Sequence, residues 1–338
     1  MLSKVTILET TLRDGSYTNN FSFSFKNTQE ICKKLEDVGF EFIEIGHGLG
    51  MNASNSGYGK AKETDENYMI AADQILSKSK YGMFCIPGIA NLSDIDLGSK
   101  HNMDFVRIGT DVTKVEDSEN FIKKAKNYGM FVAANYMKSY AMEPEKFAEK
   151  VKLSEKYGAD IVYIVDSAGG MFPDDIEKYY NAIRNVSEIP IGFHAHDNLG
   201  LSISNNLKAI DLGINFIDSS LQGLGRSSGN ASTEVLVAVL KKLDLDTGIN
   251  FLKLLEIGKN YIQPIVTFKG KMPLDIVGGF ADFHSANMKK IIKISDKYDV
   301  NPAELMIQIS KINKIDVKED ILENIAKNLP KDYSNNLV

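Results

Sequence analysis

Two histidines separated by a single residue are the part of this sequence best suited to chemistry. They lie in Phe193-His194-Ala195-His196-Asp197-Asn198, shortly after the apolar segment Ile189-Pro190-Ile191. Side chains alternate in direction along a β-strand, so we expect His194 and His196 to point to the same side. Two imidazoles on one face at the end of a strand are suited to hold one metal ion.

A second polar segment, Thr10-Thr11-Leu12-Arg13-Asp14-Gly15, ends another apolar run near the N-terminus. Asp14 and the two histidines would form a facial ligand set with open positions, which suits Mn, Fe, Co or Zn. A 2-oxo acid fits the open positions through its carboxylate and keto oxygen, with the metal as a Lewis acid that favours the enolate. Arg13 suits a carboxylate or a developing enolate oxygen. The alternatives are two unrelated polar strand ends and, for Arg13, a structural ion pair.

The composition is that of a soluble globular protein. The chain of 338 residues is 43% apolar and 25% charged, with a net charge of −6. Its length allows one large domain plus a small one. Lysines alternate with acids, which argues against nucleic acid or an anionic membrane as partner. No apolar run approaches the ~20 residues of a membrane-spanning helix, and the N-terminus lacks a signal-peptide core. Cys32 and Cys85 are isolated, so we expect buried thiols and a cytoplasmic location.

Short apolar runs alternate with amphipathic segments along most of the chain. The predicted strands are Val5–Glu9, Glu41–Ile45, Met83–Pro87, Phe105–Gly109, Phe131–Tyr136, Ile161–Asp166, Pro190–His196 and Phe216–Ser220. The predicted helices are Thr28–Val38, Asp65–Ser77, Leu92–Ser99, Ser118–Tyr128, Pro144–Tyr157, Pro173–Val186, Leu201–Leu212 and Ser232–Leu243. This alternation implies parallel strands, and eight units in roughly 250 residues is the size of a (β/α)8 TIM barrel. An open doubly wound sheet is the alternative, but Leu12-Arg13-Asp14-Gly15-Ser16 is not its glycine-rich phosphate-binding turn.

The sequence divides into an expected catalytic barrel, residues 1–248, and a mainly helical C-terminal domain, residues 249–338. Asn301-Pro302-Ala303-Glu304 is a good helix start. We expect this second domain to pack on the barrel, on another subunit or on a partner. In a barrel, polar residues at the carboxyl ends of the strands meet at one face, which would bring Asp14, His194 and His196 together.

The two polar segments also carry a family resemblance. Thr10–Ser16 and Gly192–Leu199 resemble the signature segments of the metal-dependent pyruvate aldolases and acyl-CoA lyases, and most of all those of the 4-hydroxy-2-oxovalerate aldolase family. Further matches are Ile45-Gly46-His47-Gly48, Ile86-Pro87-Gly88-Ile89, Val165-Asp166-Ser167-Ala168-Gly169, Ser228-Gly229-Asn230-Ala231 and the C-terminal region.

The resemblance implies a divalent metal, usually Mn²⁺ with Mg²⁺, Co²⁺ or Zn²⁺ as alternatives, held by Asp14, His194 and His196. It implies that Arg13 stabilises a pyruvate enolate during reversible retro-aldol cleavage of a 4-hydroxy-2-oxo acid to pyruvate and an aldehyde. It places Asn230 beside the metal or on it as a weak ligand; a loop-capping role is the alternative.

The chain departs from the family pattern at two positions. The family carries a histidine directly after Arg-Asp-Gly-Ser, as the base toward the substrate 4-hydroxyl, and a tyrosine from the C-terminal domain. This chain has Tyr17 at the first place, and His284 aligns with the second. Imidazole titrates near pH 7 and phenol near 10, so we expect His284 to be the base and Tyr17 to donate a hydrogen bond to the same oxygen. The alternative is a surface His284 and a Tyr17 that only walls the pocket.

The expected substrate pocket is more polar than the family's. We expect it to be lined by His47, Phe84, Ile86, Tyr136 and Ser167, with Asn135 and Lys138 adding polarity. Phe84 would narrow the pocket, so the aldehyde would be more polar or differently shaped than acetaldehyde. Ordinary variation at strand ends is the alternative for these residues, and His47 is equally suited to cap a loop.

The resemblance further implies a partner and leaves other functions open. Typical members associate with an acylating aldehyde dehydrogenase, and we expect a homo-oligomer that uses the C-terminal domain for one of these contacts. A Claisen-type acyl-CoA synthase or lyase is an alternative, although that class usually has Glu where this chain has Gly15. The second alternative is a regulatory barrel that binds metal without turnover.

Overall fold

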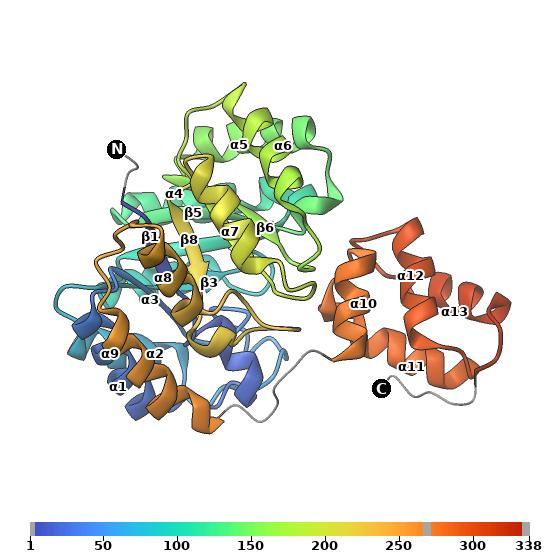
Figure 1. The fold of residues 1–338 in the computed structure, drawn as a ribbon, viewed down its shortest axis with the longest axis horizontal. Helices are drawn as coiled ribbons and strands as arrows, with labels where there is room; N and C mark the ends of the chain where they lie inside the picture. The colour runs from blue at the N-terminus through green and yellow to red at the C-terminus, as the bar shows by residue number, and fades with distance from the viewer. Residues whose placement is uncertain (1–3, 266–271, 333–338) are drawn as a thin grey trace.

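The computed structural model describes residues 4–265 and 272–332. It confirms a closed barrel of parallel strands surrounded by helices, with further helices beyond it (Figure 1). The strands are β1 (Thr6–Glu9), β2 (Phe42–Ile45), β3 (Lys80–Cys85), β4 (Phe105–Asp111), β5 (Phe131–Met137), β6 (Ile161–Asp166), β7 (Ile191–Ala195) and β8 (Phe216–Ser219). They pair in chain order, and β1 pairs with β8, with Ile7 opposite Ile217, which closes the barrel.

The helices of the barrel follow its strands. They are α1 (Phe25–Val38), α2 (Asp65–Ile75), α3 (Leu92–Lys100), α4 (Glu119–Asn127), α5 (Pro144–Tyr157), α6 (Pro173–Arg184), α7 (Ser202–Asp211) and α8 (Thr233–Lys242). After them come α9 (Phe251–Ile257), α10 (Pro273–Ala281), α11 (Met288–Tyr298), α12 (Pro302–Ile312) and α13 (Glu319–Asn328). Helix α12 begins at the predicted Asn301-Pro302, where the Asn301 side chain accepts hydrogen bonds from the backbone N–H groups of Ala303 and Glu304.

Local interactions shift two elements from their predicted positions. Helix α1 begins three residues early because Ser24 caps it: the Asn27 N–H donates to Ser24 Oγ (3.2 Å), and the Ser24 N–H donates to Asn27 Oδ1 (3.1 Å). Strand β3 also starts three residues early. Gly82, which precedes the predicted strand, makes room for a neighbouring ring, since a Cβ on it would lie 2.5 Å from a ring carbon of Phe105.

The inside of the barrel is layered, because every second residue of a strand faces inward. Phenylalanines fill the N-terminal end, where the rings of Phe42, Phe105, Phe131 and Phe216 contact one another. Two residues further along three of these strands lie Glu44, Arg107 and Asp218, each at most 1% exposed. The apolar floor thus supports a charged middle layer directly below the site.

A second hydrophobic core belongs to the C-terminal helices. It includes Leu274 of α10, Ile291 of α11, Leu305 of α12 and Leu322 of α13. Helix α9, with Leu254 and Ile257, instead joins the barrel core, although the sequence places the domain boundary before it, at residue 248. Residues 266–271 and 333–338 of the expected second domain lie outside the described residues.

Helix α10 lies beside the loops that follow β7 and β8, on the barrel side of the C-terminal helices (Figure 1). Asn198 Nδ2 donates to the Asp275 carbonyl (2.8 Å), and Ser227 Oγ donates to Asp275 Oδ1 (2.8 Å). Asn198 Nδ2 also donates to Ser227 Oγ (2.8 Å). Two barrel loops are therefore tied to the start of α10, which places the C-terminal domain over the carboxyl ends of these strands.

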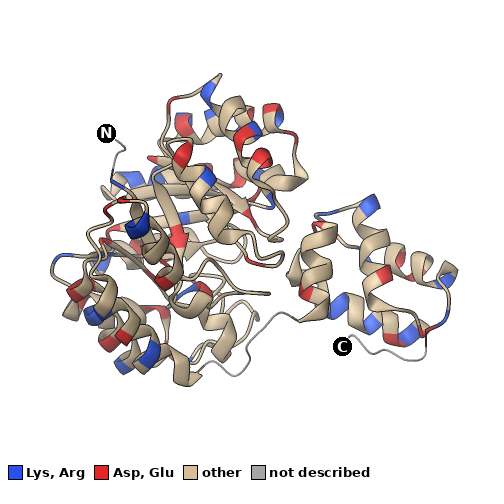
Figure 2. Cartoon of the chain, viewed as in Figure 1, with Lys and Arg blue, Asp and Glu red and all other residues tan. Residues whose placement is uncertain are grey.

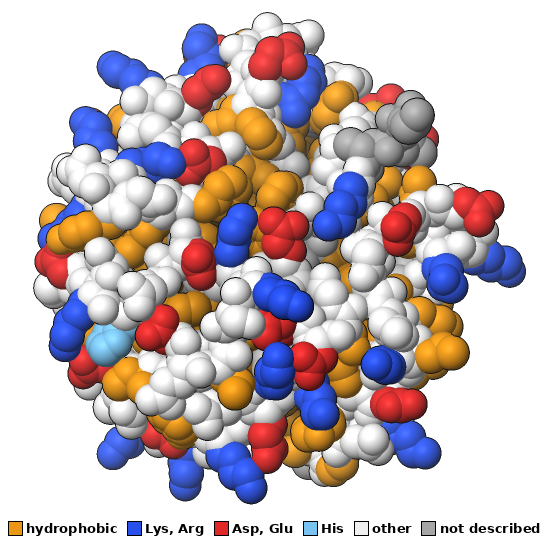
Figure 3. Space-filling view, turned by 90° about the vertical axis from the view of Figure 1, so that its left-hand side faces the viewer, with side chains coloured by type: hydrophobic (Ala, Val, Ile, Leu, Met, Phe, Trp, Pro, Cys, Tyr) orange, Lys and Arg blue, Asp and Glu red, His pale blue; other side chains and the backbone are white. Residues whose placement is uncertain are grey.

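Charged residues of both signs are mixed over the elements (Figure 2). The face turned away from the C-terminal helices shows the same mixture, with small apolar areas between the charges (Figure 3). No helix within the described ranges is long and apolar enough to cross a membrane. Cys32 and Cys85 are buried and unpaired, as predicted.

Candidate functional site

The two predicted metal-ligating segments meet at the barrel mouth. After β1 the chain turns back on itself, and the Asp14 N–H donates to the Thr10 carbonyl (2.8 Å). One ligand atom from each of Asp14, His194 and His196 lies within 4.8 Å of the other two. Throughout residues 4–265 and 272–332, no other group of three His, Cys, Asp or Glu side chains is arranged to share one ion.

Each histidine is oriented by an acceptor at Nδ1. His194 Nδ1 donates to Asp218 Oδ2 (2.8 Å), and His196 Nδ1 donates to the Arg226 carbonyl (3.1 Å). The neutral rings therefore turn their Nε2 lone pairs toward the same space, where the two Nε2 atoms lie 3.4 Å apart. Burial lowers the pKa of His196 to about 4, so this ring is neutral at physiological pH. Carboxylate or carbonyl acceptors behind metal-binding histidines are a general feature of metal sites.

Asp14 is held as an ionised carboxylate. Arg13 Nη1 donates to Oδ1 (2.7 Å), and Asn230 Nδ2 donates to Oδ2 (2.7 Å). Burial opposes ionisation, but Arg13, the two histidines and the Asn230 hydrogen bond together outweigh it and keep the pKa of Asp14 well below its usual range. Gly225 permits this close packing, because a Cβ there would lie 2.9 Å from Asp14 Oδ2. Asn230 Oδ1 is buried without a hydrogen-bond partner among the described atoms, as expected of an oxygen next to a metal or its water.

A buried ionic chain connects Arg13 with His194 beneath the ligands. Arg13 Nε donates to Glu44 Oε2 (2.7 Å), which also accepts from Arg107 Nη1 (3.0 Å). Arg107 Nη2 donates to Asp218 Oδ2 (2.6 Å), the atom that accepts from His194. Arg107 thus fixes, through one carboxylate on each side, both Arg13 and a histidine of the candidate metal site.

One cavity of about 40 Å³ lies directly above the ligands. Most of the predicted site residues line it, namely Arg13, Asp14, Tyr17, Phe84, Ile86, Ser167, His194, His196 and His284, together with Asn135 and Arg226. Phe84 lies under the guanidinium of Arg13, whose Cζ is 4.8 Å from the ring centroid. Lys138 is not among the lining residues, and its Nζ is bound to Asp111 (3.0 Å).

His284 reaches this cavity from the C-terminal domain and is only 7% exposed. Its Nδ1 accepts a hydrogen bond from the Ala286 N–H (3.2 Å). An acceptor at Nδ1 puts the proton of the neutral ring on Nε2. Burial and the charges of Arg226 and Lys138 lower the pKa of His284 well below that of a free histidine, so the neutral ring is the stable form.

His47 does not line the cavity, contrary to expectation. The Leu49 N–H donates to its Nδ1 (3.0 Å), and its Nε2 lies 3.2 Å from the Gly59 carbonyl, so it holds two loop segments together. Its ring stacks on Phe21 at 3.8 Å, and Phe21 meets the Tyr17 ring edge-on at 5.1 Å. His47 supports the wall that Tyr17 forms instead of facing the substrate.

Tyr136 is also wrongly predicted as a pocket residue. The preceding Asn135 faces inward, where its Oδ1 accepts from Arg107 Nη2 (2.9 Å), so Tyr136 faces outward. Its hydroxyl lies between strand and helix, donating to Ser154 Oγ (2.6 Å) of α5. The alternation along β5 distinguishes the two residues once one of them is placed.

Sequence reasoning missed four residues of the site: Glu44, Arg107, Asp218 and Arg226. Three of them carry a signal, because each is a charged residue inside an apolar strand, as in Phe105-Val106-Arg107-Ile108. A buried charge needs a partner, so three such charges at inward positions of alternate strands of one barrel predict an ionic cluster. Arg226 lies in a polar loop, where no pattern distinguishes it.

A larger cavity of about 550 Å³ lies between the β5–α5 and β6–α6 loops and α10. Its walls include Tyr140, Met142, Phe172, Tyr179 and Phe280, and none of the candidate ligands. Size alone does not identify the reacting centre here, since the smaller cavity has the ligand set and the buried charges.

The fold and the site define a (β/α)8-barrel protein with a candidate divalent-metal centre at the strand ends. The HMGL-like family model matches residues 4–260. The 4-hydroxy-2-oxovalerate aldolase of Carboxydothermus hydrogenoformans is 35% identical over 336 residues, covering 98% of this chain and 99% of that protein. The protein of the same name from Moorella thermoacetica is 33% identical, covering 96% of both chains. The chain therefore belongs to the 4-hydroxy-2-oxovalerate aldolase family.

Solved structures agree on the fold. The carboxyl transferase domain of Rhizobium etli pyruvate carboxylase superposes with a TM-score of 0.78 at 14% identity, covering 97% of this chain and 61% of that one. At this identity the likeness concerns the architecture alone.

Proposed function

We propose that this protein is a divalent-metal-dependent aldolase that cleaves a 4-hydroxy-2-oxo acid to pyruvate and an aldehyde, and forms it in reverse. The convergence of Asp14, His194 and His196 beside Arg13, in a chain of this family, is the observation that supports the proposal most. In cleavage the C3–C4 bond breaks, the 4-hydroxyl gives its proton to solvent, and C3 of the resulting enolate takes up a proton from solvent to give pyruvate.

Asp14 and the Nε2 atoms of His194 and His196 would hold the metal ion, with Asn230 Oδ1 next to it. Such an ion acts as a Lewis acid toward a keto oxygen. We favour Mn²⁺, because a carboxylate and two imidazoles suit it, and Mg²⁺, Co²⁺ or Zn²⁺ are the alternatives.

The buried charges favour an anionic substrate. Arg13 and Arg107 face the three carboxylates of Asp14, Glu44 and Asp218, which leaves one net negative charge. A divalent cation changes the sum to one net positive charge, which a 2-oxo carboxylate neutralises. Charge that develops on the enolate oxygen then lies beside Arg13, whose position is fixed before the reaction by Glu44 and Asp14.

His284 handles the 4-oxygen of the substrate in this proposal, but as a donor and not as the base that the sequence predicts. Its neutral ring presents Nε2–H to the cavity because Nδ1 accepts from Ala286. A neutral imidazole can polarise a carbonyl in this way, here the aldehyde oxygen in the synthetic direction. Tyr17 is then the second group near the same oxygen, and burial raises the pKa of its phenol, which keeps it protonated.

Pyruvate release tests the proposal. Chelator-treated protein reloaded with Mn²⁺, Mg²⁺, Co²⁺ or Zn²⁺ is given 4-hydroxy-2-oxopentanoate, and pyruvate is measured with lactate dehydrogenase and NADH. We expect metal-dependent pyruvate formation that Asp14→Asn abolishes. Release of free thiol from an acyl-CoA substrate would instead assign the Claisen class, and metal binding without any turnover would assign a regulatory barrel.

We further propose a homo-oligomer and an aldehyde dehydrogenase partner in the cytoplasm. Apolar side chains exposed on one side of α10 support a protein contact, with Ile276 45% and Phe280 71% exposed. Buried, unpaired Cys32 and Cys85 support a reducing compartment. Light scattering of the purified protein tests the first proposal, and co-purification from the native cell tests the second.

A further inference from the structure

Arg226 places a second guanidinium in the small cavity, next to Asp14, Tyr17, His196 and His284. Among the described residues its side chain has no hydrogen-bond acceptor and no ion pair. Its recorded contact is with the ring of Tyr17, whose centroid lies 5.1 Å from its Cζ. The other positive groups nearby are occupied, since Arg13 binds Asp14 and Glu44, and Lys138 binds Asp111.

The backbone of Arg226 is fixed on several sides. Its carbonyl accepts from His196 Nδ1 and from the Gly229 N–H (3.0 Å). The next residue, Ser227, is bound by Asn198 and by Asp275 of α10. The guanidinium is therefore held over the cavity by a rigid loop and by the stacked wall of Tyr17, Phe21 and His47.

The two cavity arginines lie at different depths. Arg13 is 5% exposed, and two carboxylates bind it through Nε and Nη1. Arg226 is partly exposed at the rim, where the C-terminal domain contributes His284. Asp14 is the one carboxylate among the residues that line the described cavity, and Arg13 and Asn230 already bind it. The rim thus offers an unpaired cation to whatever part of the substrate extends past the metal site.

We propose that Arg226 is a specificity-determining residue that binds an anionic group, a carboxylate or a phosphate, on the aldehyde half of the substrate. This inference rests on the proposed aldolase function. The 2-oxo acid end occupies the deep site with Asp14, His194, His196 and Arg13, and the far end of the chain meets the guanidinium at the rim. Arg226 lines the same small cavity as the candidate ligands, so a substrate that extends from the metal site toward this rim meets its side chain.

The experiment compares matched aldehydes in the synthetic direction, with pyruvate and Mn²⁺ and with product quantified by NMR. Butanal is paired with 4-oxobutanoate, which has a carboxylate in place of the terminal methyl group. Glycolaldehyde is paired with glycolaldehyde phosphate. We expect kcat/KM for at least one anionic aldehyde to exceed that of its neutral partner by about 10- to 100-fold, the range of a charge-assisted hydrogen bond. The better pair identifies carboxylate or phosphate as the natural group.

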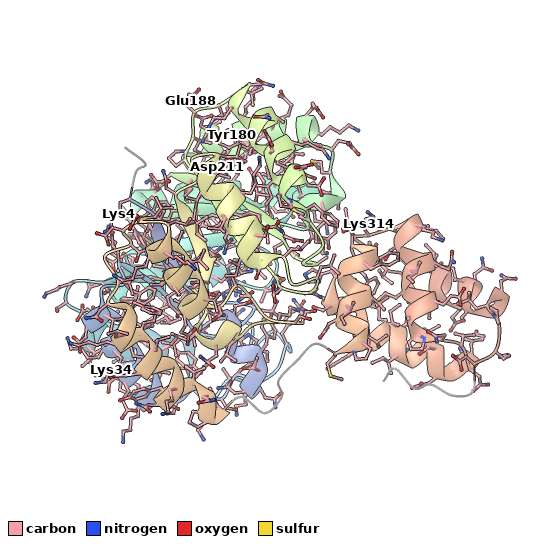
Figure 4. The ribbon with its side chains drawn as sticks, in the orientation of Figure 1. Lys4, Lys34, Tyr180, Glu188, Asp211 and Lys314 are labelled. Atoms are coloured by element: carbon pink, nitrogen blue, oxygen red, sulfur yellow. The ribbon has the colours of Figure 1, made fainter. Side chains whose placement is uncertain are left out.

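The ratio of kcat/KM for the anionic aldehyde to kcat/KM for its neutral partner should fall close to one in Arg226→Gln. Arg226→Lys should retain part of the wild-type ratio. Lys34→Gln removes one positive charge from the exposed side of α1, far from Lys314 of the C-terminal domain, and should leave the ratio unchanged (Figure 4). Circular dichroism checks that the variants are folded. The wild-type ratio is informative by itself if Arg226→Gln does not fold.

Deuterium exchange into the pyruvate methyl group separates the two proposals. Exchange by the wild type together with equal kcat/KM for neutral and anionic aldehydes would overturn the role of Arg226 and leave the aldolase function standing. If Arg226→Gln lowers exchange as much as it lowers aldol addition, Arg226 serves the pyruvate carboxylate and the inference is wrong. No exchange and no product with any aldehyde would overturn both.

Discussion

The deep half and the rim half of the site are built differently. In the deep half, Asp14, His194 and His196 each have a fixed hydrogen-bond partner, and Arg13 is bound by two carboxylates. The rim groups come from three separate parts of the chain. They are Tyr17 in the turn after β1, Arg226 in the loop after β8 and His284 in the C-terminal domain. Their polar atoms have few partners. The barrel thus fixes the atoms that react with the 2-oxo acid, while the rim is free to determine which aldehyde is accepted.

Loss of a metal ligand should have the largest effect. We expect His196→Ala to lower kcat by at least about 10³-fold and to reduce bound metal in proportion, because the remaining ligands cannot hold the ion in place. Metal content by mass spectrometry and the pyruvate assay measure both. His101→Ala is the matched control, since His101 ends α3 away from the site and contacts Glu66. A metal content equal to wild type in His196→Ala would contradict the assignment of the deep half.

Removal of Arg107 should disturb the deep half without touching the metal. Arg107→Met leaves Glu44 and Asp218 buried with one cation fewer, and breaking a buried pair of this kind costs about 3–5 kcal/mol in the free energy of unfolding. We also expect kcat to fall by about 10-fold, because Arg13 and His194 lose their common support. Urea denaturation and the pyruvate assay test this.

The matched variant is Arg107→Met combined with Glu44→Gln, which removes one of the uncompensated charges. It should recover part of the stability but not the activity, because Arg13 then has no carboxylate at Glu44. An Arg107→Met protein as stable and active as wild type would show that the ionic chain does not support the site.

Substitutions of His284 should have a smaller effect at the rim. His284→Ala is expected to lower kcat/KM by about 10-fold, the value of one hydrogen bond to the substrate oxygen. His284→Gln keeps an N–H donor and should recover much of the loss. His284 is the base that the sequence predicts if two results are found together. His284→Gln would lower kcat/KM as much as His284→Ala, and the wild-type rate would fall as pH drops because one group becomes protonated.

Protonation of His196 offers the mildest perturbation of the deep half. An ordinary histidine would be mostly protonated at pH 5, whereas burial lowers the pKa of this one to about 4. The ring should therefore stay neutral and able to bind metal at pH 5, and lose this ability only as pH approaches 4. Histidine ¹⁵N NMR shifts of the metal-free protein measure this directly. A midpoint near 6.5 would mean that the ring is not enclosed as described.

The sequence predicts the barrel and the meeting of the deep residues well, and the rim only in part, for physical reasons. Alternating strands and helices follow from local apolar patterns, and the ends of parallel strands meet wherever a barrel closes, so Asp14, His194 and His196 can be placed without coordinates. Glu44, Arg107 and Asp218 were open to the same reasoning, as charges in apolar strands. Tyr136 was misplaced because the inward face of β5 depends on its partner strands. Tyr17 and His284 were brought to the rim by the family resemblance, and both line the cavity. Arg226 depends on how a loop folds over the mouth, which no local pattern encodes.

The location of the metal tests the central claim most directly. Crystals of the wild-type protein soaked with Mn²⁺ and measured for anomalous scattering should give one strong peak in contact with an Asp14 oxygen and with Nε2 of His194 and His196. A strong peak elsewhere, with this position empty, would contradict the claim that these three side chains form the reacting centre.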